Sequence, residues 1–98
     1  MKTVYKYPLS KNQHTELRLP MGAMLLHVDA QKDGVFLWAE IETETPEIEI
    51  RTIEVFGTGH AMPPYQRFFL NTFLVHGGEF VFHAYERLKP EYTLQKND

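Results

Sequence analysis

The stretch RFFLNTFLVHGGEFVFHAYE, residues 67–86, decides the fold class. Two runs of aromatic and β-branched residues flank Gly77 and Gly78, and a glycine pair between such runs is typical of a tight β-hairpin turn. With the turn there, Val75 lies opposite Phe80, and one face of the hairpin collects Phe69, Phe73, Val75, Phe80 and Phe82. This apolar face predicts a core. The other face is mixed and carries Thr72, Leu70, Leu74, His76, Glu79, Val81, His83 and Tyr85.

Strand patterns fill the rest of the chain, at residues 3–9, 14–20, 23–30, 35–42 and 47–56. Pro8 near the end of the first run is typical of an edge strand. In the last run the alternation slips between Ile50 and Ile53, which predicts a β-bulge near Arg51 and Thr52. About seven short strands predict an all-β fold, a single antiparallel β-sandwich or barrel over residues 1–88. A polar C-terminal tail, residues 89–98, follows.

A second hairpin is predicted around the Asp-Gly signal in residues 31–34. Its core face pairs Ala30 with Val35, Val28 with Leu37, and Leu26 with Ala39. On the other face His27 lies across from Trp38, and Asp29 lies across from Phe36. An indole beside an imidazole could stack a planar ring and hydrogen-bond its edge. The same residues also fit a dimer interface, or a face that another strand covers, because interfaces favour aromatic side chains.

Composition excludes several classes of function. The 98 residues contain no cysteine, which removes disulfides, thiol nucleophiles and zinc fingers. The formal charge of −3, with acids scattered along the chain, argues against a nucleic-acid surface. No apolar run approaches the roughly 20 residues of a membrane span. We therefore expect a cytoplasmic protein with no nucleic-acid or membrane partner.

The loop after the run 47–56 reads GTGHAMPPYQ, residues 57–66. Gly57 and Gly59 permit positive φ and close approach of the backbone, and consecutive amides in such a turn can form an anion-binding nest. Thr58 adds a hydroxyl group and His60 a proton donor. Together these four residues could hold a phosphate. They could equally form a wide connection between two sheets, with the glycines needed only for its geometry.

Metal and catalytic sites have weaker support. The five histidines are not spaced as H-x-H or H-E-x-x-H, so no metal site is predicted. No nucleophile is fixed beside a base, although His60 with a carboxylate could serve a hydrolase. We predict binding rather than catalysis, with no catalytic residues and no cofactor.

An ordered set of short motifs resembles a family of short, uncharacterised tailed-phage and prophage proteins. The motifs are VYKYPL, LPMGAMLLHV, LWAEIE, GTGH and FLVHGGEFVFHAYE, and they extend from Tyr5 to Glu86. The chain departs from the expected pattern at Asn71, where a glycine would precede the threonine. Asn71 could take the turn-like or bulged role of that glycine.

The resemblance implies phage origin and expression in the cytoplasm of a bacterial host. Small phage proteins of this kind often act by binding, which suggests counter-defence by sequestering a cyclic or ADP-ribose-type nucleotide signal of host immunity. The alternative is a module that inhibits a host protein through an aromatic sheet face. We expect a homodimer or higher homo-oligomer. The predicted ligand-binding residues are His27, Trp38, Gly57, Thr58, Gly59, His60, His76, His83 and Tyr85.

Overall fold

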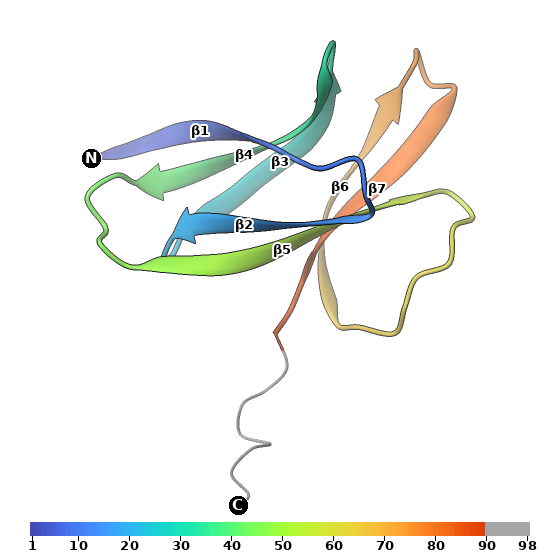
Figure 1. Ribbon diagram of the computed structural model, residues 1–98. Helices are drawn as coiled ribbons and strands as arrows, with labels where there is room; N and C mark the ends of the chain where they lie inside the picture. Colours follow the sequence, from blue (N-terminus) through green and yellow to red (C-terminus); the bar gives the residue numbers. More distant parts are fainter. Residues whose placement is uncertain (90–98) are drawn as a thin grey trace, which may run out of the picture.

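A computed structural model describes residues 1–89 and shows two antiparallel β-sheets packed face to face (Figure 1). The seven strands are β1 Lys2–Pro8, β2 His14–Pro20, β3 Met24–Gln31, β4 Gly34–Glu42, β5 Ile48–Gly57, β6 Arg67–Val75 and β7 Phe80–Arg87. The predicted all-β class is confirmed, as a sandwich and not as a closed barrel. Within residues 1–89 there is no helix long and apolar enough to span a bilayer. Most of the predicted polar tail, residues 90–98, lies outside the described residues.

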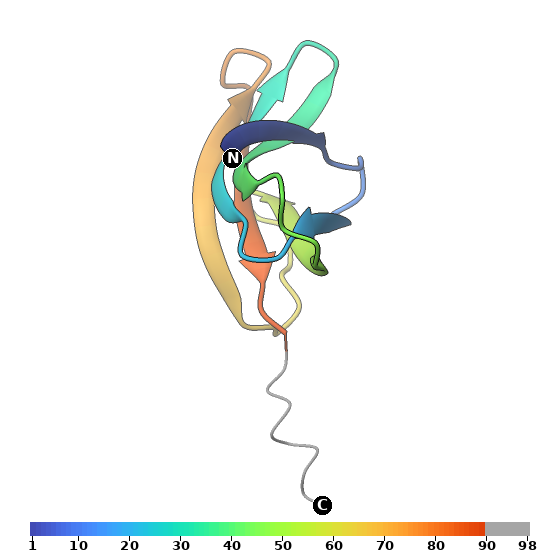
Figure 2. The same ribbon diagram turned by 90° about the vertical axis from the view of Figure 1, so that its left-hand side faces the viewer.

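Sheet A has the strand order β1-β4-β3, and sheet B has the order β2-β5-β7-β6. The sheets approach each other along β3 and β6, while β1 and β2 form the opposite, open side. At the closed side the Asn71 side chain bonds twice to the backbone of β3: its Nδ2 donates to the Val28 carbonyl at 2.7 Å, and the Val28 amide donates to its Oδ1 at 2.8 Å. Figure 2 shows the β3–β4 and β6–β7 hairpin tips at the same end of the molecule.

The core lies between the sheets and draws on both. Its buried members are Leu17, Leu19, Ala23, Val28, Leu37, Ala39, Ile41, Ile53, Phe73 and Ala84. Both predicted hairpins contribute to it, since Val75 pairs with Phe80 and Val28 with Leu37 as expected. At the β6–β7 tip, Gly77 and Gly78 have φ values of 66° and 97°, which only glycine adopts readily.

Two β-bulges correct the predicted faces. One lies between Leu25 and His27, so Leu25 and not Leu26 pairs with Ala39, and Leu26 is exposed. The other lies between Phe69 and Asn71.

The second bulge exchanges the roles of two neighbouring residues. Leu70 packs against the core, whereas Phe69 pairs with Tyr85 on the outer face and is 57% exposed. Phe80 faces inward as expected, but it lies at the β6–β7 tip and is 49% exposed. The apolar face of this hairpin is therefore only partly core.

The bulge predicted near Arg51 and Thr52 is wrong, because β5 pairs regularly with β2 from Ile48 to Glu54. The alternation slips because β5 has buried residues on both faces. Ile53 points into the core, whereas Glu54 and Phe56 are buried on the outer face of sheet B.

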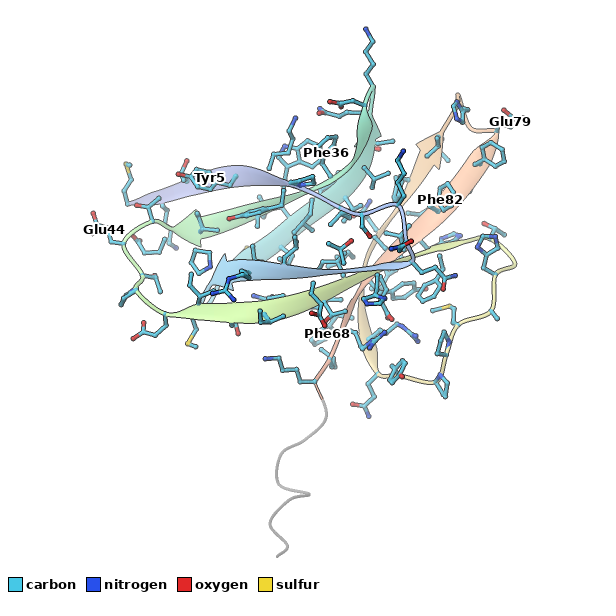
Figure 3. All side chains as sticks on the ribbon, in the orientation of Figure 1. Tyr5, Phe36, Glu44, Phe68, Glu79 and Phe82 are labelled. Carbon is cyan, nitrogen blue, oxygen red and sulfur yellow. The ribbon has the colours of Figure 1, made fainter. Side chains whose placement is uncertain are left out.

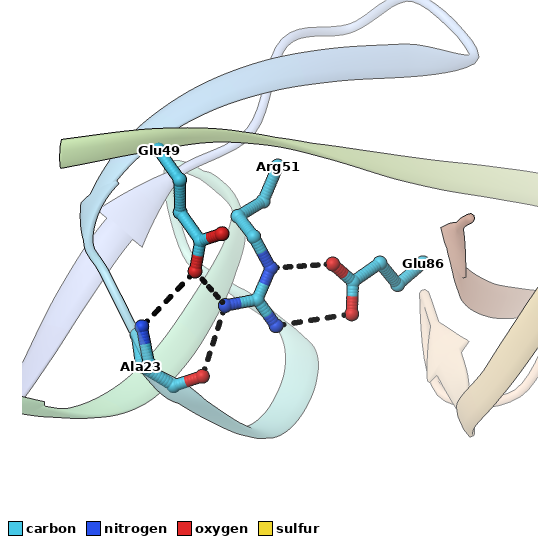
Figure 4. Close-up of polar contacts among 5 residues, drawn as sticks. Ala23, Glu49, Arg51 and Glu86 are labelled. Carbon is cyan, nitrogen blue, oxygen red and sulfur yellow. Dashed lines mark hydrogen bonds and ion pairs between the residues drawn. The ribbon is translucent and has the colours of Figure 1, made fainter. Parts of the chain in front are cut away.

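Arg51 consequently faces the inside of the sandwich, and its charge is satisfied there (Figure 4). Its Nε and Nη2 donate to the Glu86 carboxylate of β7, and its Nη1 donates to the Ala23 carbonyl at 3.0 Å and to Glu49 at 3.2 Å. The guanidinium group thus ties β5 to β7 and to the start of β3.

The outer face of sheet B carries a second ion cluster, centred on Glu54. The Glu54 side chain is only 3% exposed. Arg67 of β6 and Arg87 of β7 both donate to its carboxylate. Arg67 also donates to the carbonyls of Pro63 and Tyr65, at 2.7 and 3.1 Å. The buried carboxylate of Glu54 therefore holds Arg67 in place, and Arg67 in turn holds the loop between β5 and β6.

Candidate pocket at the end of the sandwich

The GTGH turn, residues 57–60, is braced by its own histidine. The His60 amide donates to the Gly57 carbonyl at 3.0 Å, and the Gly57 amide donates to Nδ1 of the His60 ring at 3.3 Å. The ring lies so close over Gly57 that a Cβ atom there would be 2.9 Å from its Cε1. The spacing of glycine and histidine therefore has a local cause: only glycine leaves room for the ring.

This brace fixes the tautomer of the neutral ring. Because Nδ1 accepts a hydrogen bond from the Gly57 amide, the proton of a neutral imidazole resides on Nε2. His60 thus offers one directed N–H donor at the rim of the fold.

The predicted anion nest is largely unavailable. The amides of Gly57 and His60 are used inside the turn, and that of Thr58 donates to the Val81 carbonyl at 3.1 Å. Gly59, with φ of 89°, holds the one amide of this turn that makes no such bond within the described residues. An anion would therefore depend on side chains more than on the backbone here.

A pocket of about 250 Å³ opens beside this turn, between the two sheets. Its floor is apolar and consists of inward-facing residues of four strands, Val35, Val55, Phe73 and Phe82 (Phe82 is labelled in Figure 3). Its rim consists of the β1–β2 loop, residues 10–13, and of Gly57 and His60 of the GTGH turn. An apolar pocket with a few polar groups at its mouth is the usual form of a small-molecule site.

The charge of the rim has one sign. Lys11 is the charged residue of the lining, and no acidic residue contributes to it, although the whole chain has a net charge of −3. Ser10, Asn12 and Gln13 add hydroxyl and amide groups. The mouth therefore suits a ligand with an apolar part and an anionic or hydrogen-bond-accepting end.

A second hollow of about 460 Å³ adjoins the pocket and shares Gly57, His60 and Phe82 with it. Thr58, Phe80 and Val81 complete this hollow, together with the acidic Glu79 of the β6–β7 turn. The His60 ring therefore borders both spaces.

Comparison with models of protein families assigns the chain to a family. The family model described as "Domain of unknown function (DUF7352)" matches residues 1–95. The chain belongs to the DUF7352 family. No curated protein and no solved structure matches it.

Thr58 and His83, two of the predicted site residues of this DUF7352 protein, are in contact. The Thr58 hydroxyl lies 2.8 Å from His83 Nε2, and the Thr72 hydroxyl lies 2.9 Å from His83 Nδ1. His83 thus connects the GTGH turn to β6 across the outer face of sheet B. Tyr85 lies on this same face, with its ring packed edge-on against those of Phe56 and Phe69.

His27 and Trp38 are adjacent as predicted, directly opposite each other on β3 and β4. They lie on the outer face of sheet A, whereas the pocket opens between the sheets. The structure therefore does not bring Trp38 and the GTGH turn into one site within a single chain. His76 is also apart from both, at the β6–β7 tip with its ring against Phe80.

Two contributors to these sites were missed from sequence. The β1–β2 loop, residues 10–13, forms half of the pocket rim, and Thr72 completes the contacts of His83. The polar run SKNQ between two predicted strands marks a loop, but only the order of strands in the sheets shows that it lies beside the GTGH turn.

Proposed function

We propose that this DUF7352 protein binds a nucleotide-like small molecule in the end pocket. As a phage-encoded protein it would sequester a cyclic or ADP-ribose-type signal of host immunity, without chemistry. The observation that carries the proposal is the rim: Lys11 and His60 line an apolar pocket that has no carboxylate in its lining.

The parts of a nucleotide fit this arrangement. A base is planar and largely apolar on its faces, so it suits a floor that includes Phe73 and Phe82. A phosphate is an anion and suits Lys11, as well as the amide side chains beside it. The pocket is slightly smaller than the roughly 300–1,000 Å³ of ordinary ligand sites. A dinucleotide would therefore extend past His60 into the adjoining hollow.

Thermal unfolding with a panel of nucleotides tests the proposal. The panel contains nucleoside monophosphates, cyclic dinucleotides and ADP-ribose, each at a concentration well above micromolar. A ligand present at about 100 times its dissociation constant adds roughly 2.7 kcal/mol to the free energy of unfolding. For a chain of this size that corresponds to a rise in Tm of about 10–20 °C.

Matched variants locate the site. Lys11→Ala should weaken binding of any nucleotide that raises the Tm, whereas Lys32→Ala, at the exposed tip of the β3–β4 hairpin, should not. Trp38→Ala should leave the affinity unchanged, because Trp38 lies outside the pocket. If no nucleotide of the panel shifts the Tm, or if Lys11→Ala and Lys32→Ala bind alike, the proposed site is wrong.

A further inference from the structure

The hydrogen bond that holds the His60 ring exists only while Nδ1 carries no proton. The Gly57 amide donates to Nδ1 of the ring at 3.3 Å. A backbone amide nitrogen donates and does not accept, whereas both nitrogens of a protonated imidazole carry a hydrogen. Protonation of the ring would therefore bring two N–H groups face to face and break the contact. Within residues 1–89 the ring makes no second hydrogen bond that would keep it in place.

Two other histidines have partners that tolerate a second proton. The two nitrogens of the His83 ring lie 2.8 and 2.9 Å from threonine hydroxyls, and a hydroxyl can accept as well as donate. His27 has its Nε2 3.7 Å from the carboxylate of Asp29, which attracts a protonated ring. Of these three histidines, only His60 loses its contact when it is protonated.

The charged residues beside the His60 ring favour its movement in one direction. The ring lines both the pocket and the adjoining hollow. Lys11 of the β1–β2 loop lines the pocket and repels an imidazolium, whereas Glu79 of the β6–β7 turn lines the hollow and attracts it. Among the described residues, the strands contribute only uncharged side chains to the two linings. A protonated ring is therefore drawn out of the pocket wall and toward the hollow.

We propose that the GTGH turn, residues 57–60, is a pH-sensitive switch of the end pocket. While the ring is neutral, its bond to Gly57 keeps the turn closed and the pocket wall complete. When the ring is protonated, the turn opens and the pocket releases its ligand. The release of a nucleotide rests on the proposed function, whereas the motion of the ring rests on its hydrogen bond alone. Histidine is the side chain that ordinarily changes charge between pH 5 and 8, so mild acid operates the switch.

The charge that the ring gains does not offset the loss of the wall. An imidazolium attracts a phosphate, which by itself would favour binding in acid. A ring that has left Gly57 carries this charge on a mobile and exposed side chain, however, where water and salt screen it. We therefore expect acid to weaken binding and not to strengthen it.

Nuclear magnetic resonance of the isotope-labelled protein without ligand tests the motion. Between about pH 7.5 and about pH 5.5 the Gly57 amide proton should move to lower chemical shift, with the same midpoint as the ring protons of His60. In His60→Ala the Gly57 resonance should stay constant. In His76→Ala, at the β6–β7 tip, it should move as in the unchanged protein. A Gly57 resonance that does not follow the His60 ring, or that still moves in His60→Ala because His83 titrates, would overturn the switch.

Calorimetric titration at the same two pH values tests the release. The ligands are a cyclic dinucleotide and ADP-ribose, because a phosphate monoester would itself gain a proton near pH 6. Histidine in model peptides is half protonated near pH 6.5, so about a tenth of it is neutral at about pH 5.5. Since only the neutral form binds, the dissociation constant should rise about tenfold. His60→Ala should bind more weakly and equally at both pH values, whereas His76→Ala should keep the tenfold change.

The two experiments separate failure of the switch from failure of the proposed function. An affinity that stays constant or rises toward pH 5.5 would overturn the release, because the protonated ring would then hold the ligand. If neither nucleotide binds at either pH, the proposed function is wrong, and the Gly57 resonance still decides whether the switch exists. Circular dichroism at both pH values shows that a loss of affinity is not a loss of fold.

Discussion

At the closed side of the sandwich the Asn71 side chain bonds β6 to β3, so Asn71→Ala tests how much this link stabilises the fold. The alanine removes both hydrogen bonds to Val28, at 2.7 and 2.8 Å. Each bond contributes about 0.5–1.5 kcal/mol net. Val28 is fully buried, so its amide and carbonyl would also lose their partners in a place that water reaches poorly. We expect a total loss of about 3 kcal/mol, a large part of the roughly 5–15 kcal/mol that stabilises an ordinary domain.

Urea unfolding, followed by far-UV circular dichroism, measures this loss as a lower midpoint at unchanged slope. Thermal unfolding should show a Tm lower by about 12–24 °C. Asn12→Ala is the matched control, because the side chain of Asn12 makes no hydrogen bond within the described residues; its effect should stay within about 0.5 kcal/mol. Asn71→Asp keeps an acceptor for the Val28 amide but no donor for its carbonyl, so it should be no better than alanine. A loss below about 1 kcal/mol for Asn71→Ala would refute the role of this side chain in joining the sheets.

Three more outcomes follow from the packing and the charges. Glu54→Gln should cost roughly 3 kcal/mol in urea unfolding, because the buried guanidinium group of Arg67 and the partly exposed one of Arg87 lose their counter-ion. Burial raises the pKa of Glu54, but the hydrogen bonds from its two arginines outweigh burial and hold the pKa below its usual value. The stability from the ionised carboxylate is therefore present at neutral pH and lost as the pH falls below about 4, so an acid titration of unfolding should be flatter in Glu54→Gln. Phe73→Ala should cost about 3–5 kcal/mol and Phe80→Ala less than about 1.5, since only Phe73 is buried; equal losses would contradict the described faces. Gly57→Ala should displace the His60 ring and abolish nucleotide binding while circular dichroism stays unchanged, and retained binding would show that the ring position does not matter.

The strands and the main hairpin could be predicted from sequence because their signals are local. Gly77 and Gly78 lie at the centre of a four-residue turn, residues 76–79, and Val75 then pairs with Phe80. The two bulges could not be predicted, since Phe69 and Leu70 are both apolar and either one could face the core. The regular β5 could not be predicted either. Its buried Glu54 and its inward Arg51 break the usual pattern, and their partners come from β6 and β7.

The candidate pocket was only half predictable for a similar reason. The GTGH motif indicates one side of the rim, because glycines that permit positive φ and a histidine that can donate a proton are local signals of a binding loop. The other side is the ordinary-looking loop of residues 10–13, which reaches the pocket only through the pairing of β2 with β5. Trp38 and His27 were correctly paired, but nothing in their sequence neighbourhood indicates which sheet they occupy.

The order of strands in the two sheets also determines the course of events during synthesis. β1 pairs with β4 and β2 with β5, so Lys2 meets Glu42 and His14 meets Glu54, each 40 residues later in the chain. At about 5–20 residues per second, a ribosome needs roughly 2–8 s to deliver those partners. Until then the two N-terminal strands have no neighbour with which to share their backbone hydrogen bonds. The β3–β4 and β6–β7 hairpins can form as soon as each emerges, whereas β1 and β2 must wait for strands that are made 40 residues later.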